Sequence, residues 1–152
     1  MRHISFVALS TVLISTSAFA AEIAPDDVSF GEDGEVNASI TGVAGDPVAG
    51  KLAFTNRKQG NCLACHINDD ASGESFHGEV GPPLNGVAGR WEEAQLRGIV
   101  VNSKMTFEDT IMPSFYRTTN GARTMEEFAG MPILTAQQVE DVVAYLITLK
   151  EE

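Results

Sequence analysis

The residues of this chain best suited to chemistry lie together in the segment Cys62-Leu63-Ala64-Cys65-His66. Two thiols separated by two residues can each add across one vinyl group of a haem, and the histidine that follows then lies under the iron. A Cys-x-x-Cys-His segment is therefore typical of covalent haem attachment. We expect thioether bonds from Cys62 and Cys65 to one haem c, and an axial bond from His66 to its iron.

Three other roles for the cysteine pair have to be weighed against haem. A thiol–disulfide redox motif has the same spacing, but it usually lies in a βαβ unit, which this sequence lacks. A structural zinc site would need His77 as a fourth ligand beside Cys62, Cys65 and His66. A disulfide between residues so close in sequence would stabilise little. Haem is favoured because the chain has no other cysteine and begins with an export signal.

A second axial ligand should come from a methionine, since a histidine–methionine pair raises the haem potential. Beyond residue 20 the methionines are Met105, Met112, Met125 and Met131. Met112 and Met131 each precede a proline, as axial methionines commonly do, and Met131 also falls just before the last predicted helix. The residues alone leave the choice between Met112 and Met131 open.

Two helices are predicted on either side of the cysteine segment. Asp46-Pro47 offers an N-cap followed by proline at the first helical position, which predicts a helix that runs to about Asn56. A second helix is predicted from about Trp91 to Asn102. Its apolar face consists of Leu96, Ile99 and Val100.

The last predicted helix has the clearest signals. Thr135-x-x-Gln138 forms a capping box, in which the two side chains satisfy backbone N–H groups that have no partner within the helix. Glu140 and Asp141 are expected near the positive end of the helix dipole. The apolar residues that recur at helical spacing are Val139, Val142, Val143 and Leu146.

Long loops separate these helices, at residues 68–89 and 103–122. Loops of this length are uncommon inside a small domain. They are explained if a large rigid prosthetic group fills the middle of the domain and the loops wrap around it. A short helical turn is predicted at residues 124–128.

The first 20 residues have the pattern of a secretory signal peptide. Arg2 precedes an apolar stretch, and Ala18-Phe19-Ala20 has the small-x-small form of a cleavage site. The stretch is too short to cross a membrane comfortably, and no later run approaches the roughly 20 apolar residues of a spanning helix. We expect cleavage after Ala20 and a soluble periplasmic protein with no membrane span.

The mature chain is expected to have an N-terminal arm at 21–45, with one short strand around 36–40, and a single haem domain at 46–152. The formal charge of the chain is −11, and removal of Arg2 makes it −12. Between residues 21 and 50 there are seven acidic residues and no lysine or arginine. Such a surface repels nucleic acid and anionic lipid, so neither is expected as a partner.

The segment 81–90, Gly-Pro-Pro-Leu-Asn-Gly-Val-Ala-Gly-Arg, resembles the G-P-x-L-x-G-x-x-G-R loop of class I cytochromes c. The resemblance implies an all-α class I cytochrome c fold, with helices and long loops wrapped around one haem. It also implies that the Pro82 carbonyl accepts a hydrogen bond from His66. Two further positions carry over: Leu84 would pack on the proximal face of the haem, and Arg90 would lie near a haem propionate.

The first predicted helix is similar to that family too. Gly50 and Phe54 match the glycine and the aromatic residue that pack across the last helix, here near Tyr145. The gap from Phe54 to Cys62 is longer than in the simplest members. We therefore expect the first helix to extend or to bulge in that gap.

Three stretches resemble more specifically the SoxX subunit of the SoxAX cytochrome complex of sulfur oxidation. They are residues 60–66, residues 109–117 with Ile111-Met112-Pro113 at their centre, and residues 132–146. In that family the Ile-Met-Pro segment supplies the distal ligand. The resemblance therefore implies Met112 as the axial methionine, with Met131 as the alternative.

The same resemblance implies a role in a complex. SoxA, a second haem subunit, would be the heterodimer partner and would carry the catalysis of an L-cysteine S-thiosulfotransferase, which joins thiosulfate to a cysteine of the SoxYZ carrier complex. This chain, with no catalytic residue of its own, would accept the electrons and pass them to a small cytochrome c. A free, diffusible cytochrome c is the alternative. The residues expected at the docking surface are Arg57, Lys58, Leu63, Ser114 and Phe115.

Overall fold

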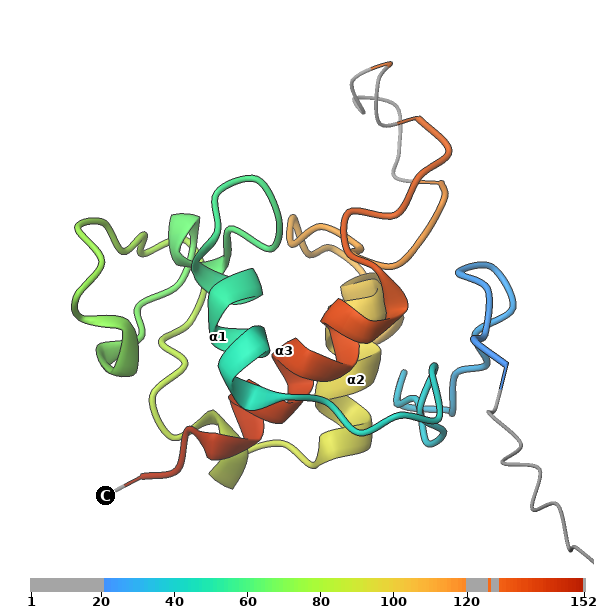
Figure 1. The fold of residues 1–152 in the computed structure, drawn as a ribbon, viewed down its shortest axis with the longest axis horizontal. Coiled ribbons are helices and arrows are strands. Elements are labelled where there is room, and N and C mark those ends of the chain that lie inside the picture. The colour runs from blue at the N-terminus through green and yellow to red at the C-terminus, as the bar shows by residue number, and fades with distance from the viewer. Residues whose placement is uncertain (1–20, 120–125, 127–128, 152) are drawn as a thin grey trace, which may run out of the picture.

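Three α-helices frame the part of the molecule that the structure describes (Figure 1). Their bounds in the computed structural model are α1 (Pro47–Thr55), α2 (Glu93–Asn102) and α3 (Ala136–Thr148). The structure describes residues 21–119, 126 and 129–151. The predicted signal peptide lies outside these residues, as does the predicted turn at 124–128 except for Glu126. None of the helices in the described part of the chain is long and apolar enough to cross a membrane.

Helix α1 begins where its capping residues predict. The Asp46 carboxylate accepts a hydrogen bond from the Val48 N–H at 2.8 Å, and Pro47 occupies the first turn, where its missing N–H costs nothing. The helix ends at Thr55, and the N–H of Asn56 still bonds the Leu52 carbonyl. The predicted bounds are therefore confirmed to within one residue.

The crossing of α1 over α3 explains the glycine in the first helix. A Cβ atom on Gly50 would lie 1.9 Å from the Asp141 carbonyl oxygen and 2.9 Å from the Tyr145 Cβ, so only glycine allows the two backbones to approach so closely. One turn further along, the rings of Phe54 and Tyr145 meet edge to face with centroids 5.3 Å apart. The predicted packing of Gly50 and Phe54 against the last helix is confirmed.

Helices α2 and α3 both begin with a capping box. In α2 the pair is Glu92 and Gln95, and in α3 it is Thr135 and Gln138, as predicted. The second helix therefore begins two residues later than expected. The predicted apolar faces are buried, and their members are Leu96, Ile99, Val100, Val139, Val142, Val143 and Leu146.

The N-terminal arm lies on the α2 side of the molecule (Figure 1, blue to cyan). The expected strand at 36–40 is wrong: no strand is assigned in the described residues. The backbone of this segment bonds to helices instead of to another strand. The Val36 N–H donates to the Ala94 carbonyl at 2.9 Å, and the Ile40 N–H donates to a Glu140 carboxylate oxygen at 2.7 Å.

The segment between α1 and Cys62 forms a compact turn. The helix neither extends nor bulges, contrary to the expectation for this gap, because the Gly60 N–H folds back onto the Ala53 carbonyl at 3.0 Å. Asn61 then takes a left-handed conformation with φ +47°. Asparagine adopts this conformation more readily than most residues, and it redirects the chain into the cysteine segment.

Candidate haem site

The attachment segment is a short 3-10 helix, η1 (Cys62–Ala64), continued by one further turn. The N–H groups of Cys65 and His66 both donate to the Cys62 carbonyl, at 3.1 and 3.0 Å. Residues three positions apart on such a turn point the same way, so the two thiols lie on one side with the histidine next to them. Leu63, only 5% exposed, anchors the turn in the core.

A second segment runs alongside the attachment turn and supports it. Its N–H groups bond carbonyls of residues 63–67, and the pairs are Gly78 to Leu63 at 2.8 Å, Gly81 to Cys65 at 2.8 Å and Leu84 to Ile67 at 2.9 Å. A Cβ atom on Gly81 would lie 2.4 Å from Cε1 of the His66 ring. The imidazole therefore lies directly against the Gly81 backbone, in space that any other residue would occupy.

Pro82 determines which nitrogen of the His66 ring carries the proton. Its carbonyl oxygen lies 2.7 Å from His66 Nδ1. Because a carbonyl can only accept, Nδ1 must carry the proton, and the lone pair of the neutral ring is left on Nε2. A histidine bound to a metal almost always donates its other nitrogen in this way. The ring is thus prepared to bind iron through Nε2.

Both thiols are free and half-buried. Burial raises the pKa of the Cys62 thiol to about 12. A raised pKa disfavours the thiolate, which is the form that a redox-active cysteine needs. Addition to a vinyl group of haem consumes a thiol and leaves a neutral thioether, which suits this environment.

The zinc alternative would need His77, and that side chain is already engaged. Its Nδ1 accepts from the Asn68 N–H at 3.2 Å, and its Nε2 lies 3.1 Å from the Ala71 carbonyl, to which it donates. Within the described residues no group of three or more histidine, cysteine, aspartate and glutamate side chains could hold a metal ion. The donor set at Cys62 and Cys65 therefore fits haem better than zinc.

The distal candidate Met112 is half-buried and packs against the core. Its carbonyl accepts hydrogen bonds from Ser103 Oγ at 2.9 Å and from Lys104 Nζ, both in the 3-10 helix η4 (Ser103–Met105). Ser114 Oγ donates to the Asn102 side chain at 2.7 Å. The methionine is thus held at the C-terminal end of α2 by bonds on both of its sides.

The same segment also closes the end of α2. The N–H groups of Phe115 and Tyr116 donate to the Val100 and Val101 carbonyls, each at 3.2 Å. These carbonyls belong to the last turn of the helix, where no N–H of the helix itself can reach them. Met112 therefore lies on a segment whose backbone is pinned to a rigid element, as a metal ligand requires.

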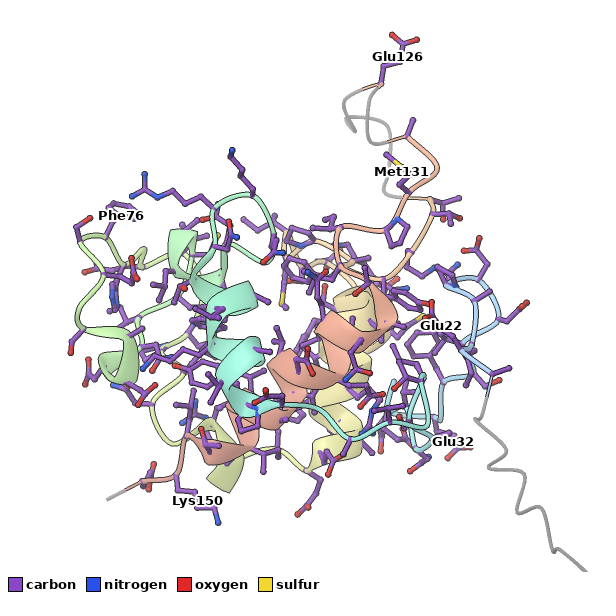
Figure 2. All side chains as sticks on the ribbon, in the orientation of Figure 1. Glu22, Glu32, Phe76, Glu126, Met131 and Lys150 are labelled. Atoms are coloured by element: carbon purple, nitrogen blue, oxygen red, sulfur yellow. The ribbon has the colours of Figure 1, made fainter. Side chains whose placement is uncertain are left out.

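Met131 has a different setting. Its side chain is 50% exposed, and Figure 2 shows it in the loop that projects beyond the ends of the helices. Met105 is 48% exposed, and Met125 lies outside the described residues. The described methionine with partial burial against the core is Met112, which makes it the better placed candidate for the axial ligand.

Several apolar side chains near these ligands are only partly covered by protein. Leu84, Trp91 and Met112 pack against the core but remain half-exposed, and Trp91 meets Phe107 edge to face at 5.8 Å between centroids. A large apolar group such as the haem macrocycle would cover such surface. The role of Trp91 was not predicted, although the sole tryptophan of the chain, directly after Arg90, was a signal for it.

Arg90 braces the loop that carries Pro82. Its two terminal nitrogens donate to the carbonyls of Asn85 at 2.6 Å and Pro83 at 2.8 Å. Asn85 in turn exchanges two hydrogen bonds with Asp69, at 2.9 and 2.7 Å. The predicted residues Pro82, Leu84 and Arg90 thus belong to one cross-linked loop beside His66.

A polar network with a buried core at Asn68 and Tyr145, which the sequence did not predict, ties this loop to the helices. The Asn68 side chain is fully buried and donates to the Tyr145 hydroxyl at 2.9 Å, and that hydroxyl donates to Asp70 at 2.7 Å. Lys51 reaches the same Asp70 carboxylate at 2.8 Å. The hydrogen bond from Lys51, and then that from Tyr145, lower the pKa of Asp70, whereas burial and Asp70 raise the pKa of Tyr145.

The residues expected at the docking surface differ in how exposed they are. Arg57 and Lys58 are exposed, and Arg57 lines a pocket of about 360 Å³ together with Phe76. Leu63 and Phe115 pack in the core and are only 5% and 6% exposed, so little of either side chain is open to a partner. Ser114 is half-buried, and the role of all five residues in docking stays a prediction.

Comparisons with known proteins agree with this geometry. The family model described as cytochrome c matches residues 47–150. The chain is similar to one in the crystal structure of SoxXA from P. pantotrophus, with 48% identity, a TM-score of 0.81 and coverage of 86% of this chain and 100% of that chain. It is also similar to cytochrome c2 from Rhodobacter sphaeroides, with 22% identity, a TM-score of 0.41 and coverage of 71% and 98%. A search of curated proteins finds no match.

The family match spans more than half of the chain, and the similarity to the SoxXA chain spans the whole of that relative. The all-α fold with its long loops agrees with the class I cytochrome c architecture that the sequence predicted. Haem c is the cofactor, and Cys62 and Cys65 have the spacing that its covalent attachment needs. The chain therefore belongs to the cytochrome c family, as a monohaem electron-transfer protein of the SoxX type.

Proposed function

We propose that this chain is the electron-accepting subunit of a periplasmic heterodimer with a SoxA haem subunit. The observation that carries the proposal is the 48% identity over the full length of a chain from a SoxXA crystal structure. In the proposed reaction the outer sulfur of thiosulfate joins a cysteine thiol of the SoxYZ carrier, which forms a sulfur–sulfur bond, breaks the S–H bond and releases one proton and two electrons. A single haem accepts them one at a time, so a small cytochrome c must remove each one.

Seven residues are proposed to hold the cofactor. Cys62 and Cys65 form the thioether bonds, His66 binds the iron through Nε2, and Met112 binds it from the other side. When bound, the haem supplies a one-electron redox couple whose potential the methionine raises. The supporting positions are Pro82, which holds the His66 ring, Leu84, which packs on the proximal face, and Arg90, which braces the loop and lies near a propionate.

The sulfur chemistry is proposed to belong to the partner. Cys62 and Cys65 are the only cysteines in the sequence, and both are used by haem attachment. No thiol then remains to act as a nucleophile or to carry a sulfur atom. This chain would therefore need the SoxA subunit for thiosulfate conjugation and would contribute electron transfer alone.

The proposal is tested by purifying the tagged chain from cells grown on thiosulfate. We expect a second haem-bearing subunit to co-purify, and the mass of this chain to show cleavage after Ala20. A chain that purifies alone from such cells, at monomer size, would favour a free, diffusible cytochrome c and would contradict the proposed complex.

A further inference from the structure

We propose that the N-terminal arm, residues 21–45, acts as a strap that positions the methionine ligand by bracing η4. The inference rests on the proposed ligation of the iron by Met112. The arm reaches two parts of the molecule: the buried faces of α2 and α3, where it is anchored, and the segment 103–118, which carries Met112. The contacts with the segment 103–118 are the ones that bear on the methionine, and the contacts with α2 and α3 hold the arm on the molecule.

The anchor is a buried ion pair between α2 and α3. Arg97 and Glu140 are each only 4% exposed, and Arg97 Nε lies 3.1 Å from the Glu140 carboxylate. The pair also binds the backbone of the arm. Arg97 donates to the Val36 carbonyl at 3.0 Å, and Glu140 accepts from the Ile40 N–H at 2.7 Å. The two charges thus satisfy each other and hold the arm against both helices.

The part of the arm around Gly34 lies directly against η4. Gly34 has φ +81°, and a Cβ atom there would lie 2.6 Å from Thr106 Oγ1 and 2.7 Å from the Met105 carbonyl carbon. The Thr106 hydroxyl also donates to the Asp33 carbonyl at 3.3 Å. Glycine is therefore needed at this position both for the backbone conformation and for the close approach to η4.

The 3-10 helix η4 in turn is bonded directly to Met112, the proposed ligand. Ser103 and Lys104 are the two residues of η4 that donate to the Met112 carbonyl. A second contact ties the arm to the far end of the same segment, because the Tyr116 hydroxyl donates to the Ile23 carbonyl at 2.8 Å. The methionine segment thus lies between α2 on one side and the arm on the other.

The strap matters because a thioether is a weak ligand. Its bond to the iron breaks and re-forms, which gives an open and a closed state of the site. Each opening needs the methionine segment to move away from the iron, and every contact that resists this movement favours the closed state. An added ligand such as imidazole binds only the open state, so its affinity measures how easily the segment moves. The arm lowers that affinity if it braces η4.

The experiment measures imidazole binding to the oxidised holoprotein. Gly34→Ala forces the arm away from η4, and we expect it to raise imidazole affinity by roughly three- to tenfold. The matched control is Gly45→Ala. Its Cβ would lie 2.1 Å from the Glu140 carbonyl oxygen, so it disturbs the arm at α3 and not at η4. It should lower the urea midpoint of unfolding and leave imidazole affinity unchanged.

Two further variants complete the test. Thr106→Val removes the hydrogen bond to Asp33 without adding volume. It should also raise imidazole affinity, but by a smaller factor than Gly34→Ala. If Gly34→Ala yields no holoprotein, the result with Thr106→Val decides the test. Wild-type affinity in both variants, or an equal rise in Gly45→Ala, would overturn the strap. Met112→Ala separates the two proposals: if it keeps the sulfur-to-iron charge-transfer band, the ligand assignment has failed rather than the strap.

Discussion

His66 shows how neighbours give one side chain a single chemical role. The Pro82 carbonyl lies 2.7 Å from Nδ1, and the Gly81 backbone lies against the ring. The Cys-x-x-Cys-His motif and the resemblance to class I cytochromes predicted the residues and the Pro82 bond. The reason for glycine at 81 could not be predicted, because it depends on how the segment 78–84 packs alongside the attachment turn.

Replacing Gly81 with alanine is expected to displace the His66 ring. The new Cβ would overlap Cε1 and Nδ1, which lie 2.4 and 2.7 Å away. We expect a loss of about 1–3 kcal/mol in the free energy of unfolding, measured in urea, together with an altered haem absorption spectrum. Gly73→Ala is the control, since a Cβ there meets nothing within 4 Å. An unchanged spectrum and stability in Gly81→Ala would contradict the described packing.

The axial methionine is tested by two matched substitutions. Met112→Ala should abolish the sulfur-to-iron charge-transfer band of the oxidised protein and lower the haem potential by on the order of 0.1 V, because the thioether favours reduced iron. Met131→Ala, in the projecting loop, should leave both nearly intact. Absorption spectra and redox titration measure the two effects, and a reversed result would make Met131 the ligand.

At the scale of elements, the helices could be predicted because their signals are local. The N-cap at Asp46, the proline after it and the capping box of Thr135 and Gln138 each act within one turn of helix. The bounds therefore agree with the prediction to within two residues. The long loops could be predicted only as lengths of chain, since their course depends on the haem and on distant helices.

The arm shows where local signals fail. The alternation at 36–40 suggested a strand, but the partner of Ile40 is Glu140, one hundred residues away. Glu140 itself was expected to act on the helix dipole, and Asp141 likewise. Both are buried, but only Glu140 binds the arm, because Asp141 accepts a hydrogen bond at 2.8 Å from the N–H of Asp46, the N-cap of α1. The partners in such pairs are too far apart in the sequence for any short residue pattern to predict them.

The link from α1 through Asp70 to α3 gives the protein a pH-dependent component of stability. Lys51 and Tyr145 lower the pKa of Asp70, so the folded state favours its charged form. The resulting stabilisation is fully present above the usual aspartate pKa of about 3.9 and is lost as pH falls through the lower pKa of the folded state. Asp70→Asn should therefore reduce the free energy of unfolding most at neutral pH.

The measurement is urea unfolding of the wild type and Asp70→Asn between pH 7 and about pH 2.5, a range set by the usual aspartate pKa. The difference between them should shrink below about pH 4. Lys51→Met should reproduce this pattern, because it removes the first cause of the shift. Asp109→Asn, at an exposed position, is the control and should change stability little. A difference that stays constant across the range would contradict the Asp70 link.

At the scale of the whole molecule, the charge is unevenly placed. Acidic side chains such as Glu22 and Glu32 lie exposed on the arm (Figure 2). Arg57 and Lys58 lie in the turn between α1 and Cys62, just before the haem cysteines. Charges at the rim of an interface chiefly set the rate of association and its salt dependence. The two basic residues are therefore expected to guide docking near the haem edge.

A matched pair of charge reversals tests this expectation. Lys58→Glu should slow association with the partner by roughly three- to tenfold at low ionic strength, and less at 0.1 M salt or above, where charges are screened beyond about 10 Å. Lys150→Glu makes the same change in net charge just beyond the end of α3 (Figure 2), and should have little effect. Equal slowing by both would show a general charge effect instead of a docking surface.

If the two subunits divide the work as proposed, electrons from thiosulfate reach the haem of this chain only through its partner. The haem of this chain is monitored by absorbance after mixing with thiosulfate and a carrier bearing a free cysteine, with and without the SoxA-type partner. We predict reduction of this haem, together with a carrier cysteine that gains thiosulfate, only when the partner is present. Conjugation by this chain alone, or conjugation by the complex without reduction of this haem, would contradict the account.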